Sequence, residues 1–597
     1  MKQHNIYNKV KTLMLATVVA ASGAGVMSSC SLDIEPRNEI TFEKFWNEKK
    51  DVEQIIAGCY QEMQEYGCLS RMIIWGEFRS ENVINNGPID KDVNLERIIK
   101  EGITANNAYC NWADFYRVIN RCNTVIKYAA DVAQKDPSYN GSEVKAHIAE
   151  VTAIRSLCYF YLIRTFRDVP YSEEAFIDDD QQAAMPAMPF NEVLQKLITS
   201  LEAVKLDAPA RYPESQVTYS YDYNCNRITQ TAISAMLCEM YLWAQDYDNC
   251  IRNGWDVINA KKKQAIDPTN VNYKYTESDF LDFDGFPLIG TKDISANNRY
   301  GKAFNSIFVT GNSVESIFEL NFMKGSGKNM RSNVPANNFF GGAGRAPWVK
   351  MSSYVGQDAV NGTFNVFASE NKGLDARAVE NMAYSGGKPD YINKFTTMGS
   401  VSINGSNTIS NFVSGSLWSM QYPTDGSNQE SLNKSNFIIY RLSDIMLLMA
   451  EAYAQKIQAA AGALEGDDRA NFERAFQLVN AVNKRSVLQQ ELKDTLVMES
   501  YASKAQIADL VLGERQRELM FEGKRYYDLV RRTLRDGNTE YITSKVQNKD
   551  TELKSIIVAR FSKMDAIFWP YHIDEMKVNE YLVQNSAFGS GENSSFK

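Results

Sequence analysis

The stretch ERQRELMFEGKRYYDLVRR, residues 514–532, mixes acidic, basic and apolar side chains at helical spacing. Glu514, Glu518 and Glu522 follow one another at four-residue steps, so a helix places all three on one face. Gly523 stands where such a helix would end in a left-handed turn. The stretch therefore predicts a helix with one acidic face.

Opposite charges in this stretch stand three residues apart. Arg515 with Glu518, Glu522 with Arg525, and Arg525 with Asp528 are such pairs. A cluster of carboxylates can be a catalytic site. Because each acid has an arginine within a helical turn, we favour a buried or partly buried ion network that fixes how helix pairs cross.

Helical patterns continue on both sides of this stretch. Apolar residues recur at three- and four-residue steps in 51–64, 111–130, 142–165, 191–204, 227–244, 248–260, 444–455, 472–486 and 503–521. Ser142 is the expected N-cap of its helix, and Ser503 with Gln506 predicts a capping box. Segments 227–244 and 248–260 resemble the two helices of a tetratricopeptide repeat, and 444–486 holds a second pair. Such pairs cannot bury their apolar faces alone, so we expect them to stack.

The middle of the chain has a different composition. Between Gly285 and Gly426 lie 18 of the 34 glycines, with short β-like runs such as 316–322. The predicted fold class is mainly α, with tetratricopeptide-type pairs as a scaffold for a large loop-rich lobe with few short strands. Loops on a rigid scaffold commonly carry binding. The expected parts are a signal peptide (1–29), an acylated tether (30–45), an N-terminal helical part (46–265), the loop-rich ligand-binding lobe (266–435), and C-terminal helices with a closing segment (436–597).

The first 29 residues are typical of an export signal. A basic start is followed by the apolar run Leu13–Val26, which is too short to span a bilayer, and small residues precede Cys30. We expect Cys30 to be the acylated N-terminus of a lipoprotein, on an acidic tether. Two or more acyl chains anchor a protein firmly where one does not. Ordinary signal cleavage, with Cys30 as a free thiol, is the alternative.

Composition excludes several classes of partner and chemistry. A net charge of −9 and a pI near 5.3 argue against a nucleic-acid partner. Eight cysteines follow Cys30, several of them inside helical patterns and none in a C-x-x-C pair, so we expect buried thiols and not disulfides. The chain has only three histidines, too few to favour a histidine-rich metal site or a Ser-His-Asp triad.

An acidic cluster is the one feature that suggests a metal ion. Asp279, Asp282 and Asp284 precede Gly285 and are weak calcium candidates, but they do not fit an EF-hand loop. A solvated acidic loop is the favoured interpretation. We therefore expect no cofactor, with calcium as the exception that these aspartates leave open.

Six sequence blocks occur together in one order. They are WGEFRSENV (75–83), FYRVINRCNTVI (115–126), Glu150-x-x-Ala153-x-Arg155-x-x-x-Tyr159, NFIIYRLSDIMLLMAEAY (436–453), the stretch 514–532, and FWPYHIDEMKVNEYLVQN (568–585). In this order, and with the segment that follows Cys30, they resemble the SusD/RagB family of Bacteroidetes outer-membrane lipoproteins. The chain departs from the family pattern at Arg167, Tyr571, His572 and Glu580, which are packing or turn positions.

The resemblance implies a location and a role. The body would be lipid-anchored in the outer membrane, facing the cell exterior, above a SusC-like TonB-dependent transporter. It would capture oligosaccharides or polysaccharides and deliver them to that transporter, as a receptor and not as an enzyme. Two alternatives stay open. The same fold could bind peptides, as in the RagB branch, or the chain could be a helical glycoside hydrolase with an acidic pair.

The resemblance also implies where a ligand would bind. Family sites lie in the loop-rich lobe and in the loop after the W-G-E-x-R block. Aromatic rings stack on sugars and polar side chains orient them. The candidate residues are Asn85, Asn86, Tyr273, Tyr275, Phe286, Asn298, Tyr300, Arg345 and Trp348. Trp348 is the first candidate, and the alternative is that it is a core residue of the lobe. Trp75 and Trp112 are expected to pack against helices.

Overall fold

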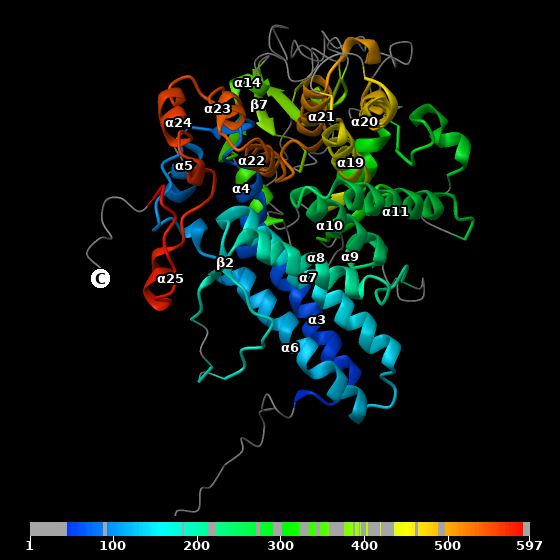
Figure 1. The fold of residues 1–597 in the computed structure, drawn as a ribbon, viewed down its shortest axis with the longest axis vertical. Coiled ribbons are helices and arrows are strands. Elements are labelled where there is room, and N and C mark those ends of the chain that lie inside the picture. The colour runs from blue at the N-terminus through cyan, green and yellow to red at the C-terminus, as the bar shows by residue number, and fades with distance from the viewer. Residues whose placement is uncertain are drawn as a thin grey trace, which may run out of the picture.

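The fold is known from a computed structural model, drawn in Figure 1. The structure describes residues 45–87, 92–178, 180–181, 184–212, 223–269, 275–290, 301–322, 333–341, 347–356, 375–385, 388–392, 394–395, 402–403, 418–419, 435–459, 464–487 and 496–588. Cys30 and the tether before Phe45 lie outside these residues, and so do Tyr273, Asn298, Tyr300 and Arg345.

The N-terminal part is a group of long helices that extends from the upper middle of Figure 1 down through its lower half. They are α3 (Lys49–Gln64), α4 (Tyr66–Glu77), α6 (Ala113–Lys135), α7 (Gly141–Phe166) and α8 (Phe190–Val204). Helix α7 is buried along most of its length because α3, α6 and α8 all pack against it. Its N-cap is Asn140, whose side chain accepts hydrogen bonds from the backbone N–H groups of Ser142 and Glu143. The expectation of Ser142 as the cap is therefore wrong by two residues.

The helix pairs stack as expected. Helices α10 (Gln230–Trp243) and α11 (Tyr247–Ile266) form one pair, and α19 (Leu442–Lys456) and α20 (Gly466–Ser486) form another. Helix α11 lies against α19, although about 180 residues separate them in the chain. Gly254 makes this approach close, because a Cβ at that position would lie 2.3 Å from Cγ of Met449. Helix α21 (Lys504–Leu519) packs on both members of the second pair.

Helix α21 begins at the predicted cap. The hydroxyl of Ser503 accepts a hydrogen bond from the backbone N–H of Gln506. The side chain of Gln506 accepts from the backbone N–H of Ala502, and not from that of Ser503, so the reciprocal half of the capping box is displaced by one residue.

Strands are few and short. In the described part of the chain each sheet has two antiparallel strands. The pairs are β1 (Val83–Asn85) with β5 (Val349–Met351), β2 (Val169–Pro170) with β3 (Ala187–Met188), β4 (Ser316–Leu320) with β10 (Phe437–Arg441), β6 (Met382–Ser385) with β7 (Lys388–Ile392), and β8 (Ser402–Ile403) with β9 (Trp418–Ser419). Strands β4 and β10 are fully buried, although each carries a charged residue, Glu319 in β4 and Arg441 in β10.

Shorter helical elements complete the chain. They are α5 (Val93–Ile99), η1 (Ala108–Cys110), α9 (Tyr223–Asn226), η3 (Glu277–Phe283), α12 (Lys302–Phe304), η4 (Asn305–Thr310), α13 (Val334–Phe340), α14 (Ser353–Gly356), α17 (Arg377–Glu380), η7 (Met498–Ser500), α22 (Arg525–Asp536), α23 (Glu540–Val546), α24 (Lys554–Arg560), η8 (Met564–Ile567) and α25 (Ile573–Val578).

The closing segment of the chain returns to the N-terminal helices. Trp569 is fully buried, and its backbone N–H donates to the carbonyl of Thr165 at the end of α7. Its ring meets Trp75 of α4 edge-on, and Trp75 stacks on Phe115 of α6 with ring centroids 4.9 Å apart. The expected packing role of Trp75 is confirmed.

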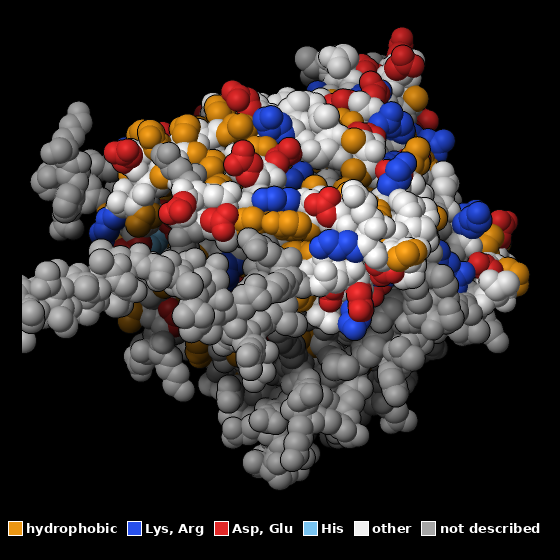
Figure 2. Space-filling view, turned by 90° about the horizontal axis from the view of Figure 1, so that it is seen from below, with side chains coloured by type: hydrophobic (Ala, Val, Ile, Leu, Met, Phe, Trp, Pro, Cys, Tyr) orange, Lys and Arg blue, Asp and Glu red, His pale blue; other side chains and the backbone are white. Residues whose placement is uncertain are grey.

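Two further features concern the state of the cysteines and the absence of membrane-spanning helices among the described residues. All eight described cysteines are buried free thiols, as predicted. Among the helices that the structure describes, none combines the length and the apolar character needed to cross a bilayer. Acidic and basic side chains are interspersed on the described part of the face seen from below (Figure 2).

Candidate ligand-binding site

The charged stretch 514–532 does not form one helix. Helix α21 ends at Leu519, Phe521 and Gly523 have positive φ values of 70° and 73°, and α22 begins at Arg525. The left-handed turn predicted at Gly523 is present. Glu522 lies in this turn, however, so it does not continue the helical face of Glu514 and Glu518.

The ion network exists, but its pairs are not those of the linear sequence. Glu518 contacts Arg377, Arg441 and Arg485. Glu522 contacts Arg441 and Lys394. Arg515 contacts Asp444 and Asp528, and Asp528 also contacts Arg531. Arg525 contacts Glu81. Glu514 contacts Arg377 and Arg517.

The expected pairs Arg515–Glu518, Glu522–Arg525 and Arg525–Asp528 are therefore wrong. Two local i,i+3 pairs do form, Glu514 with Arg517 and Asp528 with Arg531. The expected ones do not, because neighbouring elements cover the surface and bring other charged side chains within reach of the long arginines. Arg441 likewise contacts Glu518 and Glu522 and not the nearby Asp444, and Arg155 contacts Glu173 and not Glu150. Glu150 instead contacts Arg227.

Burial and charge give this network a structural role. Glu514, Glu518 and Glu522 are at most 3 % exposed. Burial alone would raise the pKa of Glu518, but Arg485, Arg441 and Arg377 outweigh it and hold the pKa well below its ordinary value. A general acid needs a pKa near the working pH and access to substrate. Glu518 has neither property.

Strands β1 and β5 bring three of the predicted ligand-binding residues together. Asn85 pairs with Val349, and the backbone N–H of Asn86 donates to the carbonyl of Trp348 at 2.9 Å. The side-chain amide of Asn86 also donates to the carbonyl of Pro347 at 3.0 Å. The loop after the W-G-E-x-R block therefore lies directly beside Trp348.

Asn85 has an unsatisfied side chain. It projects to the same side of β1 as buried Val83, and among the described residues neither its amide nitrogen nor its amide oxygen has a hydrogen-bond partner. Leaving a buried polar group unpaired costs about 1–3 kcal/mol. The register pairs Asn85 with buried Val349, so this amide lies on the core side of the β1–β5 strand pair and not on the side of Trp348.

Trp348 is half-buried. Its ring lies against Phe339 of α13, with ring centroids 6.0 Å apart, and its backbone N–H donates to the carbonyl of Asn338. Helix α13 thus fixes the backbone that carries the indole. The ring both packs on the core and keeps part of its surface open.

Phe286 and Tyr275 lie elsewhere. Phe286 is buried and stacks on Trp255 of α11, and Tyr275 packs on Phe280 of η3. Both rings therefore pack on the scaffold at α11 and η3, and neither stacks on Trp348.

The three aspartates do not assemble a metal site. Asp279 caps η3 by accepting from the backbone N–H of Thr276 at 2.7 Å, and Asp284 lies 3.9 Å from Nζ of Lys484. The described residues contain no group of three or more side chains placed to hold a metal ion.

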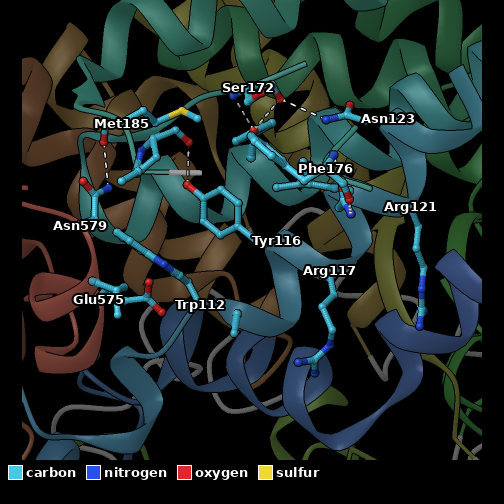
Figure 3. A pocket seen from close by; sticks show the side chains of 17 residues that line it. Trp112, Tyr116, Arg117, Arg121, Asn123, Ser172, Phe176, Met185, Glu575 and Asn579 are labelled. Carbon is cyan, nitrogen blue, oxygen red and sulfur yellow. Dashed lines mark hydrogen bonds between the residues drawn. The ribbon is translucent and has the colours of Figure 1, made fainter. Parts of the chain in front are cut away.

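A separate cavity of about 760 Å³ lies between α6, the segment 170–185 and α25 (Figure 3). Its lining residues are Trp112, Ala113, Tyr116, Arg117, Ile119, Asn120, Arg121, Asn123, Tyr159, Pro170, Ser172, Phe176, Ala184, Met185, Glu575, Val578 and Asn579. Trp112 packs on Phe166 and Tyr571 as expected, and it also forms part of this cavity. Sequence reasoning missed the site. The available signal was the one-turn spacing of Trp112 and Tyr116, but nothing in the linear sequence joins α6 to α25.

Side chains fix the wall of this cavity. The hydroxyl of Tyr116 donates to the carbonyl of Pro170 at 2.6 Å. Asn120 donates to the carbonyl of Phe176 and accepts from its backbone N–H, both at 2.8 Å. The amide of Asn579 donates to the carbonyl of Met185. The cavity is therefore preformed.

The fold defines a mainly helical protein in which stacked helix pairs support a lobe of short strands and loops. A family model described as "SusD family" matches residues 314–588, and one described as "Starch-binding associating with outer membrane" matches residues 32–242. The chain belongs to the SusD-like family.

Individual relatives agree over nearly the whole chain. SusD-like protein P38 of Formosa agariphila is 23% identical, covering 97% of this chain and 99% of that protein. A SusD homolog from Bacteroides thetaiotaomicron has a TM-score of 0.61 at 17% identity and covers 92% of this chain and 99% of its own. A solved structure described as "Laminarin binding SusD-like protein" has a TM-score of 0.56 at 18% identity. The match covers 91% of this chain and 100% of that chain.

Proposed function

We propose that the protein is a lipid-anchored receptor on the outer face of the outer membrane, where it binds oligosaccharides and passes them to a SusC-like TonB-dependent transporter. The family description of starch binding with the outer membrane and the laminarin-binding structural neighbour support the choice of glycan. The observation that carries the proposal is the half-buried indole of Trp348, held against α13 beside the loop that contains Asn86.

This arrangement suits sugar chemistry. An indole face supplies apolar area for the C–H groups of a pyranose, and amide groups exchange hydrogen bonds with its hydroxyls. Asn86 donates to the carbonyl of Pro347 and so fixes the loop beside Trp348, while the side chain of Asn85 faces the buried side of β1. Arg345, three residues before Trp348 in the sequence, lies outside the described residues and is a further candidate for contact with the ligand.

The binding test uses a glycan panel that includes laminarin and starch fragments, measured by titration calorimetry. Trp348→Ala should weaken binding of the preferred glycan at least tenfold, about 1.4 kcal/mol. Trp255→Ala removes another half-buried indole, on α11, and should leave the affinity unchanged. Binding that survives Trp348→Ala intact, or absence of binding to every glycan, would contradict the proposal.

The same experiment separates the alternatives. A peptide pool should give no binding at this site, and binding of peptides alone would favour the RagB-like function. The bound glycan should be recovered uncut after prolonged incubation. Recovery of cleaved products would show a glycoside hydrolase.

The anchor and the partner have separate tests. Cys30→Ser should move the protein from the membrane fraction to the soluble fraction, because acyl chains supply the attachment. Unchanged membrane recovery would contradict lipidation. Purification of the wild-type protein from its native membrane should bring with it a SusC-like transporter.

A further inference from the structure

The cavity between α6 and α25 contains a carboxyl group without a counter-ion. Glu575 is half-buried at its α25 end, and no described basic side chain lies within ion-pair distance of it. Burial raises the pKa of Glu575, and Trp112, its hydrogen-bonding neighbour, opposes this in part. The adjacent Asp574 differs, because it is exposed and lies 3.0 Å from Nζ of Lys577.

The opposite end of the cavity carries two arginines that already form ion pairs with a carboxylate. Nε of Arg117 lies 3.0 Å and Nη1 of Arg121 lies 3.1 Å from the carboxylate of Glu62. In Figure 3, Glu575 lies on one side of the cavity and the two arginines lie on the other, with Trp112 and Tyr116 between them. Arg117 also contacts Asp114, so the arginine end is paired and a cation that entered would be attracted chiefly to the carboxylate of Glu575.

Aromatic rings and a fixed wall complete the site. Tyr116 and Phe176 line the cavity together with Trp112, and ring faces attract cations. The side-chain amides of Asn120 and Asn579 are used to hold the wall, so the Glu575 carboxylate is the chief group left for a polar contact with a ligand. The volume is in the range of small-molecule sites.

We propose that this cavity binds an organic ammonium ion, whose carbon skeleton lies against Trp112 and Tyr116 and whose charge faces Glu575. An amino sugar and the free amino terminus of a short peptide both offer this chemistry. The cavity is formed by other elements than the β1–β5 strand pair. The proposal of an ammonium site therefore does not depend on the proposed glycan site.

The test uses four probes with the full chain in detergent. They are the β-1,4-linked disaccharide of glucosamine, its N,N′-diacetyl form, trileucine amide, and N-acetyl-trileucine amide. At least one amine probe should bind, and its acetylated form should bind at least tenfold more weakly. The preferred amine identifies the source as sugar or peptide. Failure of both amines, or equal binding of amine and acetylated forms, would overturn the proposal.

Two variants and a matched control localise the binding. Glu575→Gln keeps the shape and should lower amine affinity at least tenfold, whereas Asp574→Asn should leave it unchanged. Val578 is 73 % exposed at the rim and three residues from Glu575. Val578→Arg should supply an internal counter-ion and lower amine affinity without altering the unfolding midpoint or glycan binding at the β1–β5 ribbon. Wild-type amine affinity in either variant would overturn the assignment.

Discussion

Nη1 of Arg377 lies 2.9 Å from Oε2 of Glu518, although 141 positions separate the two residues in the chain. Arg377 belongs to α17, within the lobe, and Glu518 to α21 of the scaffold. Arg441 and Arg485 contact the same glutamate from β10 and α20. One buried carboxylate thus joins the lobe to the helix pairs.

Replacement of Glu518 by glutamine should strongly destabilise the protein. It leaves three buried guanidinium groups without their shared partner, and breaking a buried ion pair costs about 3–5 kcal/mol. Denaturant titration measures the loss in the free energy of unfolding. The exposed Glu552→Gln is the control and should change it by less than about 0.5 kcal/mol. Equal values for the two variants would contradict the structural role of the network.

Stability should fall steeply in strong acid. Burial opposes ionisation of Asp444, but Lys524 and Arg515 outweigh it and lower the pKa to about 2, from an ordinary 3.8. A carboxyl group with a lowered folded-state pKa stabilises fully above its unfolded pKa, and this contribution is lost as the pH falls through the folded value. The free energy of unfolding should therefore drop between pH 4 and pH 2. A constant value across that window would contradict the ion pairs drawn for Asp444.

Protonation of Glu77 should increase the free energy of unfolding as the pH falls from 8, which is opposite to the effect of Asp444 in acid. Burial raises the pKa of Glu77 to about 7, because one carboxylate oxygen has no hydrogen-bond partner among the described residues. The folded state then holds a proton that the unfolded state releases, so stability should increase by up to roughly 3 kcal/mol as the pH falls from 8 to 4.5.

The variant Glu77→Gln tests this dependence of the free energy of unfolding on pH. Glu380, which burial also raises to a pKa of about 7, contributes in the same direction. The single variant should therefore remove part of the slope between pH 8 and 4.5, and the double variant with Glu380→Gln should remove more. A slope unaltered in both proteins would show that these carboxyls do not titrate there.

Gly76 should tolerate no side chain. A Cβ at this position of α4 would lie 1.8 Å from the backbone carbonyl oxygen of Gly523, which itself has a φ of 73°. Gly76→Ala should lower the free energy of unfolding by at least 1–3 kcal/mol, the usual cost of overpacking. Gly141→Ala, at the start of α7 with open space around it, is the control and should be neutral or slightly stabilising. Comparable stability of the two variants would exclude the close approach of α4 to the turn.

Local features of the fold were predictable from the linear sequence. The apolar spacing of α10 and α11 and the hydroxyl of Ser503 act within one or two helical turns, so a short window contains the information. The buried state of the eight described thiols followed in the same way, because several of the cysteines fall on helical faces between apolar residues. The order of the six sequence blocks was enough to recognise the family.

Which distant groups meet was decided by tertiary packing. Asn86 contacts Trp348 because β1 pairs with β5, more than 260 residues further along the chain, and Glu575 reaches Trp112 because α25 folds back on α6. No local window contains either approach. Nor does it contain the choice of Arg377, and not Arg515, as a partner of Glu518. The sequence determined the helices and the charges they carry, whereas the choice of partners depended on how the helices packed, because a buried ion pair forms wherever packing brings opposite charges together and excludes water.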